Sequence, residues 1–402
     1  MWVPRDAEQI ERAARSGELA ETSSFDAKRE LPANSKRNAD LAVDVAAMST
    51  DGGVLLFGVG EDQHKRPTNP VPFMLAGVAD RISQIVATSI TEVPYIDVRE
   101  YPSAEDPARG YVAVIVPQSP RAPHQVTVGG DLRYYGRSAN GNRRLTEGEV
   151  ARLYERRQSW AVDRDALLAR CVAAAPLEPH ATIGYVHAFA RPVAPDEELW
   201  DRAAAAHGDQ AALRSALLSA AASSQVMGTF APSLGSGGLD WQPQGADAWR
   251  MSKWRIPDYG DPSYMADPGR LAEATFNIDG SGRMFCGRAT DVSSDGRPVV
   301  MEVIIAGNVG AFLAMMGALY AAAGYFGQVD VGVASTNVQG AGSLRMRESV
   351  GARAYGAPTF KRTARLAAAE LLDHEQRTRD LLGRFFEAAS GLVGYDPFTD
   401  GR

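Results

Sequence analysis

One stretch, residues 18–62, places acidic residues on two separate elements that could meet in space. Its first part, ELAETSSFDAKRELP, contains an alternating segment that predicts a strand, and Pro32 ends that strand. Its last part, VLLFGVGED, is an apolar run of strand length, typical of a central strand covered on both faces. A helix-like segment ending at a TDGG turn connects the two. We therefore expect carboxylates that are distant in sequence to meet at one edge of a sheet.

The spacing of Glu21, Asp26 and Lys28 suggests a specific chemistry. Glu21 and Asp26 lie five positions apart, so they reach one site only if the chain bends between them, at Thr22-Ser23-Ser24. Asp26 and Lys28 lie two apart and share a face. Metal-dependent phosphodiesterases use such groups, because carboxylate oxygens suit Mg²⁺ or Mn²⁺ and a lysine offsets charge on the phosphate. The alternative is a set of surface charges in a serine-rich turn, with Lys28 and Arg29 pairing locally.

A second group of residues, basic and aromatic, lies on a predicted hairpin. The segment HQVTVGGDLRYYGRS alternates on both sides of Gly129-Gly130, which is typical of a hairpin. Tyrosines beside guanidinium groups suit backbone phosphates and stacked bases, and a solvated strand face beside buried tyrosines is the alternative. The predicted nucleic-acid-binding residues are Arg29, Arg121, His124, Arg133, Tyr135, Arg137, Arg143 and Arg144.

Net charge, cysteine count and the absence of certain motifs limit the classes of protein to which this chain can belong. The net charge of −7 means that any nucleic-acid contact must come from a local patch. Two cysteines exclude a disulfide framework and fit a reducing cytoplasm, and no P-loop motif is present. The uncharged run 303–328 should begin as the end of a strand and become a helix after Gly307-Asn308. We expect that helix to be buried rather than transmembrane, and the protein to be cytoplasmic without a membrane partner.

The pattern of elements predicts an α/β (α+β) fold in two domains. Residues 1–157 form a mixed-sheet domain that closes with a helix, whose capping box is Thr146 with Glu149. Residues 158–402 form a second α/β domain. Within it, residues 229–269 read as a loop or lid despite three tryptophans, and 363–390 read as one long helix with a packing or dimer stripe.

Taken in order, the N-terminal motifs resemble the Schlafen AlbA-like domain family. Glu21, Asp26 and Lys28 match the signature E-x-x-x-x-[ED]-x-K, and the segments TDGGVLLFGVGED, APH, GGDLRYYGR and TEGEVARLYERR follow at suitable intervals. The resemblance covers roughly residues 8–157, under half of the chain. Ser49 replaces the usual asparagine, and Gly60 stands where an acidic residue often follows. Glu61 or Asp62 must therefore supply a third carboxylate.

This resemblance implies nucleic-acid handling. Vertebrate relatives use paired domains of this kind as metal-dependent endoribonucleases on tRNA and similar structured RNA, whereas many bacterial members are described as DNA- or ATP-binding regulators. By resemblance, Glu21, Asp26 and Glu61 would bind Mg²⁺ or Mn²⁺, and Lys28 and Asp62 complete the expected catalytic set. We expect RNA rather than DNA as the substrate. A homodimer would imitate the groove that paired domains form in the vertebrate relatives. A role in bacterial stress or phage defence is also expected. The alternative is a non-catalytic regulator that binds DNA, RNA or a nucleotide.

Overall fold

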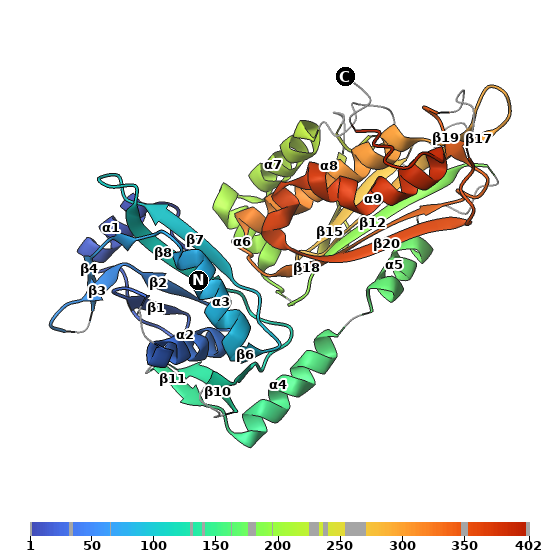
Figure 1. The fold of residues 1–402 in the computed structure, drawn as a ribbon. Helices are drawn as coiled ribbons and strands as arrows, with labels where there is room; N and C mark the ends of the chain where they lie inside the picture. The colour runs from blue at the N-terminus through green and yellow to red at the C-terminus, as the bar shows by residue number, and fades with distance from the viewer. Residues whose placement is uncertain are drawn as a thin grey trace. The chain divides into compact units, whose positions relative to one another are not determined.

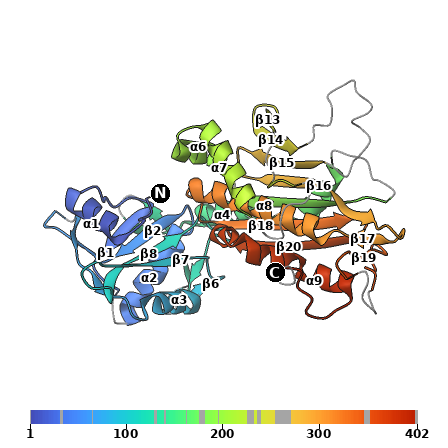
Figure 2. The same ribbon diagram turned by 90° about the horizontal axis from the view of Figure 1, so that it is seen from above.

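The computed structural model describes residues 2–31, 35–64, 66–128, 132–138, 141–161, 163–175, 182–194, 196–224, 233–235, 240–253, 271–346 and 353–398. The chain forms two compact units, Met1–Ala161 and Val162–Arg402 (Figures 1 and 2). Both combine helices with mixed or antiparallel sheets, so the fold is α+β, as expected. The division after Ala161 lies just beyond the boundary expected after residue 157.

The first unit is built on a mixed sheet with the order β1-β2-β8-β5, and β7 also pairs with β8. Its strands are β1 (Phe25–Lys28), β2 (Gly53–Phe57), β5 (Phe73–Met74), β7 (Asp97–Pro102) and β8 (Arg109–Val116). β1 runs parallel to β2, and the other pairs are antiparallel. Every residue of β2 is buried, which confirms the predicted central strand.

Helices α2 (Ser35–Met48) and α3 (Val78–Ser89) supply the apolar cover of this sheet. Leu41 and Val45 of α2 and Ile82 of α3 share a core with alternate residues of β2 and β8. Helix α1 (Ala7–Ser16) is capped by Asp6, whose side chain accepts a hydrogen bond from the backbone N–H of Gln9. The helix contacts strand β4 (Pro67–Pro70). α2 is therefore fixed against the sheet next to β1, where the candidate residues lie.

A smaller antiparallel sheet contains the predicted hairpin. Its order is β11-β10-β9-β6, from β6 (Ile90–Thr91), β9 (Gln125–Val126), β10 (Arg133–Ser138) and β11 (Gly141–Arg144). Strands β9 and β10 pair as expected, while the turn at 129–131 lies outside the described residues. β10 also pairs with β11 in a second hairpin. The capping box is confirmed, because Glu149 accepts a hydrogen bond from the backbone N–H of Thr146 at the start of α4 (Glu147–Trp160).

The second unit is a long sheet with the order β13-β14-β15-β16-β12-β18-β20. Its strands are β12 (Gly184–Pro192), β13 (Asp240–Pro243), β14 (Ala248–Lys253), β15 (Ala272–Asn277), β16 (Gly282–Val292), β18 (Gln328–Thr336) and β20 (Thr359–Ala367), extended by β17 (Pro298–Val300) and β19 (Gly342–Ser343). One face packs on α6 (Leu199–His207), α7 (Gln210–Ser223), α8 (Glu302–Ala322) and α9 (His374–Ser390), and α5 (Arg164–Ala173) lies against the other (Figure 1).

Helix α8 is the core helix of this unit. Of the described helices, it alone is apolar and long enough to cross a membrane, but 83% of its apolar window is buried inside the protein. The strand expected up to Gly307 is wrong, because the helix already begins at Glu302. Asn308 fits inside it by donating to the carbonyl of Ile304 and accepting from the backbone N–H of Leu234. Tertiary packing therefore overrides the β-like pattern of residues 299–305.

The expected single helix over 363–390 is wrong in its first third. Strand β20 continues to Ala367, and the 3₁₀ turn η4 (Ala368–Leu372) precedes α9. β20 is the last strand of the sheet and pairs with β18 along its length, so it satisfies backbone groups of β18 that would otherwise be left open. Leu382, Phe385 and Phe386 of α9 are buried in the core of the unit. The apolar stripe of this helix is thus a packing stripe.

Part of the expected loop at 229–269 is a hairpin, so that expectation is wrong for residues 240–253. β13 pairs with β14, which pairs with β15 of the main sheet. Trp249 stacks on Trp200 with ring centroids 4.4 Å apart, and Trp241 packs on the same core. These rings explain the tryptophans that the sequence placed in an apparent loop. Trp254 lies outside the described residues.

Candidate active site

The chain bends sharply between Glu21 and Asp26. Thr22 forms an isolated bridge with Phe25 across Ser23 and Ser24, and its backbone N–H donates to the carbonyl of Phe25 at 3.0 Å. The bend lies where the sequence suggested it. It allows side chains five positions apart to reach the same side of β1, and both line one cavity.

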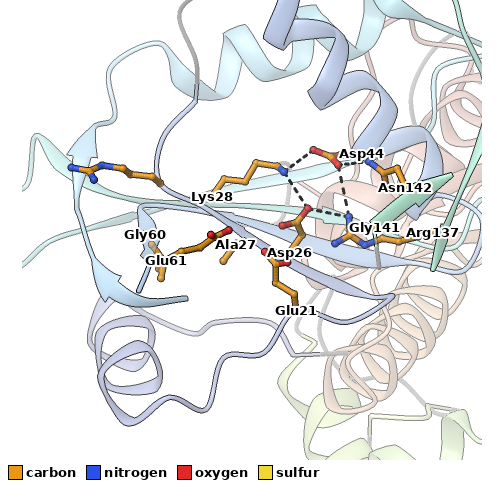
Figure 3. A pocket seen from close by; sticks show the side chains of 12 residues that line it. Glu21, Asp26, Ala27, Lys28, Asp44, Gly60, Glu61, Arg137, Gly141 and Asn142 are labelled. Carbon is orange, nitrogen blue, oxygen red and sulfur yellow. Dashed lines mark hydrogen bonds and ion pairs between the residues drawn. The ribbon is translucent and has the colours of Figure 1, made fainter. Parts of the chain in front are cut away.

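This cavity has a volume of about 670 Å³ and collects residues from several parts of the first unit. Figure 3 shows side chains from β1, α2, β3 (Val59–Glu61), β10 and β11 around it. The lining residues are Glu21, Asp26, Ala27, Lys28, Arg29, Asp44, Val59, Gly60, Glu61, Arg137, Gly141 and Asn142. Four of them are carboxylic acids and three are cationic.

Lys28 joins two carboxylates that come from different elements. Its Nζ atom lies 3.1 Å from Oδ2 of Asp26 on β1 and 3.1 Å from Oδ2 of Asp44 on α2. Burial opposes the charged form of Lys28, but the charges of Asp44 and Asp26 outweigh it and raise the pKa of the amine. Lys28 is thus a cation at any ordinary pH, with a third of its side chain exposed.

Arg137 and Asn142 hold the same two carboxylates from the opposite side. Arg137 donates from Nη1 to Asp26 at 3.0 Å and from Nε to the carbonyl of Thr22 at 3.2 Å, and only 6% of its side chain is exposed. Asn142 donates from Nδ2 to Asp44 at 2.6 Å. These contacts fix Asp26 and Asp44 in position, so the network is preorganised.

Glu21 and Asp26 form a carboxyl pair with opposite pKa shifts. Burial and a hydrogen bond to Asp26 raise the pKa of Glu21 to about 7, and the charge of Glu61 adds to the shift. Burial also disfavours the charge on Asp26, but Lys28 and Arg137 outweigh it and hold the pKa of Asp26 below its usual range. Near neutral pH, Asp26 is therefore charged while Glu21 exchanges a proton.

Glu61, rather than Asp62, is the third predicted carboxylate that reaches the cavity. The apolar run breaks at Gly58, which has a φ of 103° and separates β2 from β3. A Cβ there would lie 2.6 Å from Cδ1 of Tyr111, so only glycine fits. Asp62 instead accepts from the backbone N–H groups of His64 and Arg66 and closes its own turn. Asp62 is not among the described residues that line the cavity, and its catalytic role stays a prediction.

Sequence reasoning missed Asp44. It lies on α2 within the run ADLAVDVAAM and is 4% exposed. Leu41 is three positions before it and Met48 four positions after it, so Asp44 lies on the helix face that was expected to be apolar. A carboxylate on a buried helix face needs a partner, and that signal could have marked it.

The predicted nucleic-acid-binding residues separate into different groups. Arg29 is exposed and lines the cavity, whereas Arg137 is buried within it as a clamp. Tyr135 is partly buried and packs against the core of the first unit. Arg143 makes a bidentate pair with Glu149 at 2.8 and 2.6 Å. Arg133 and Arg144 are exposed on the hairpin, away from the cavity lining.

His124 is buried, and its predicted binding of nucleic acid stays a prediction. It is 1% exposed, and its ring nitrogens contact the carbonyl of Glu92 and, at 2.8 Å, the hydroxyl of Ser119. Burial lowers its pKa to about 4, so the ring is neutral. Arg121 is exposed nearby, its backbone N–H donating to Ser119 and its carbonyl accepting from Arg157. Neither residue lines the cavity.

The divalent cation implied by the family resemblance does not fit these side chains as they lie. Among the described residues, no three His, Cys, Asp or Glu side chains are grouped closely enough to hold an ion. Oδ2 of Asp26 is engaged by both Lys28 and Arg137. The carboxylates meet in one cavity without forming a three-ligand site. Use of Mg²⁺ or Mn²⁺ stays a prediction.

Comparison with known proteins does not assign this chain to a family. No protein-family model matches the sequence, and no curated protein is significantly similar to it.

Proposed function

We propose that the first unit cleaves RNA in this cavity, with Glu21 as the group that transfers the proton. One observation carries the proposal. Glu21, whose pKa is raised to about 7, and Asp26 line one cavity together with three cations, Lys28, Arg29 and Arg137. An acid–base pair beside positive charge suits the cleavage of a phosphodiester, whose phosphate is anionic. The likeness of the N-terminal motifs to the Schlafen AlbA-like family supports the choice of nucleic acid as substrate.

The cations divide into two roles. Arg29 is exposed at the cavity and Lys28 is partly exposed, so these two side chains are placed to contact a phosphate. Arg137 is almost fully buried and bonded to Asp26, so it positions the carboxylate rather than the substrate. Phosphate contacts of this kind give affinity without reading sequence.

RNA carries its own nucleophile next to each phosphate, and this favours RNA over DNA. A base that takes the proton of the 2′-hydroxyl lets that oxygen attack phosphorus. The bond from phosphorus to the 5′-oxygen breaks, the now protonated base gives its proton to that leaving oxygen, and a 2′,3′-cyclic phosphate remains. Glu21 in its charged form is the base, and its pKa near 7 suits that task. Asp26 stays charged, and its negative charge helps to raise the pKa of Glu21, so that Glu21 can hold a proton near neutral pH.

A second function is favoured by one feature of the same network. Lys28 contacts both Asp26 and Asp44, and Arg137 lies within ion-pair distance of both, so the buried charges balance without a substrate. A preformed network of this kind also suits a non-catalytic regulator that binds nucleic acid through the exposed arginines of the hairpin. Its binding would fall steeply with salt, without turnover, and would not depend on Glu21.

The decisive experiment incubates the full-length protein with a tRNA pool, once with Mn²⁺ and once with a chelator. Wild type is compared with Glu21→Gln and with the matched control Glu18→Gln, an exposed residue of the same type outside the cavity. We expect Glu21→Gln to cut at least about 100-fold more slowly and the control to cut like wild type. Cleavage that survives in Glu21→Gln, or no cleavage by wild type in either condition, contradicts the proposal. The chelator arm decides separately whether a metal ion is required.

A further inference from the structure

A second cavity of about 320 Å³ adjoins the candidate active site. It shares three lining residues with the larger cavity, namely Lys28, Arg29 and Asp44. Five further residues line it, which are Glu30, Leu31, Asp40, Leu41 and Phe57. A ligand that spans both cavities would therefore pass the cations that are placed to contact phosphate.

The lining of this cavity combines an apolar wall with charged groups. Leu41 and Phe57 are 3% and 1% exposed and form a fixed wall, to which Leu31 adds. Glu30 and Asp40 are exposed acids at the same cavity, and Arg29 and Lys28 are its cations. The volume is at the lower end for small-molecule sites, so it suits one ring system rather than a larger ligand.

These features select the chemistry of the ligand. Carboxylates accept hydrogen bonds, so the edge of the ring that faces Glu30 or Asp40 must carry N–H donors. Guanine presents two adjacent donors, N1–H and N2–H₂, which match the two oxygens of one carboxylate, and beside them the acceptor O6 suits a cation. Adenine, cytosine and uracil do not present two adjacent donors beside an acceptor on one edge.

We propose that this second cavity binds a guanine base next to the phosphate held at the first cavity. The inference rests on the proposed RNA-cleaving function for its biological meaning. The cavity, its apolar wall and its acids can be tested without cleavage. Binding of guanine in this second cavity would make the protein selective for RNA that has guanine beside the cut.

The test measures binding of the four nucleoside 3′-monophosphates to full-length protein by calorimetry. We expect guanosine 3′-monophosphate to bind at least about tenfold more tightly than the other three. Asp40→Asn or Glu30→Gln should remove that preference, because a hydrogen bond to a charged acceptor is lost. Glu155→Gln, an exposed acid on α4, is the matched control and should keep it. Equal or undetectable binding of all four nucleotides overturns the inference, as does a preference that survives in both variants.

Mapping the cut sites on RNA separates this inference from the function on which it rests. Cleavage that needs Glu21 but shows no guanine beside the cut, together with equal nucleotide binding, overturns the guanine site alone. Selective guanosine binding without any cleavage overturns the nuclease proposal and leaves the guanine site standing.

Discussion

Arg137 of β10 donates a hydrogen bond from Nη1 to Oδ2 of Asp26 on β1 at 3.0 Å, across 111 positions of sequence. The contact ties the hairpin sheet to the edge of the main sheet of the first unit. Because both side chains are nearly buried, removing one of them leaves the other charge with fewer partners. The pair therefore connects the stability of the unit to the geometry of the cavity.

Arg137→Ala should destabilise the first unit. Loss of one partner from a buried ion pair typically costs about 3 to 5 kcal/mol, and here Lys28 remains to offset part of the charge, so we expect about 3 kcal/mol. The loss in the free energy of unfolding is measured by chemical denaturation of the full-length protein, monitored with a probe in the first unit. Arg12→Ala is the control, since Arg12 is exposed and its pair with Glu8 is weak, and it should change stability by less than about 1 kcal/mol. Equal effects of the two variants would contradict the clamp role of Arg137.

The rate of RNA cleavage should rise with pH through about 7. Glu21 acts as a base only when deprotonated, and burial with the hydrogen bond to Asp26 raises its pKa to about 7. Below that pH the group is increasingly protonated and the rate falls, while Lys28 stays charged across the range because its pKa is raised. A pH–rate profile under single-turnover conditions measures this. A rate that is flat between pH 5.5 and 8.5 would contradict the assignment of the base.

His124→Gln should weaken folding without weakening RNA binding. The ring is buried with two hydrogen-bond partners, so replacement should cost about 1 to 3 kcal/mol. Its pKa of about 4 lies below the ordinary 6.5, so the unfolded chain binds more protons between these values. The stability contributed by neutral His124 is then full above pH 6.5 and is lost as the pH falls toward 4. Thermal unfolding at pH 7 and 5 measures both effects, and a gel-shift assay should show unchanged RNA affinity.

Gly58→Ala should disturb the site through the backbone. The residue has a φ of 103°, and a Cβ would lie 2.6 Å from the buried ring of Tyr111. Gly17 also has a positive φ, but nothing lies within 4 Å of its added Cβ, so Gly17→Ala carries only the backbone cost of about 1 kcal/mol. We expect Gly58→Ala to cost clearly more and to slow cleavage, since Glu61 follows on β3. Melting temperatures of the two variants make the comparison, and similar losses would contradict the steric account.

The sequence allowed much of the first unit to be predicted, because its signals are local. The strand-like segment of β1, the continuous apolar run of β2 and the capping box of α4 each depend on neighbouring residues only. The bend before Phe25 was also expected from spacing. Asp44 was missed because its role depends on α2 packing beside β1, and no local pattern encodes that contact.

The errors in the second unit have the same cause. β20 was read as helix because Leu366 and its neighbours fit a helical stripe, but its backbone pairs with β18. The start of α8 was read as strand because valine and isoleucine favour strands, yet the helix is buried on nearly all sides. In the first unit, His124 was taken for a surface residue because its loop carries proline and arginine.

The most direct test of the central claim is the single-turnover rate of RNA cleavage at pH 8 by wild type and by Glu21→Gln, both checked for an unchanged melting temperature. We expect wild type to cleave RNA and Glu21→Gln to cleave it at least about 100-fold more slowly. Equal rates for the two proteins, or an intact wild type that leaves RNA uncut with and without Mn²⁺, would contradict it.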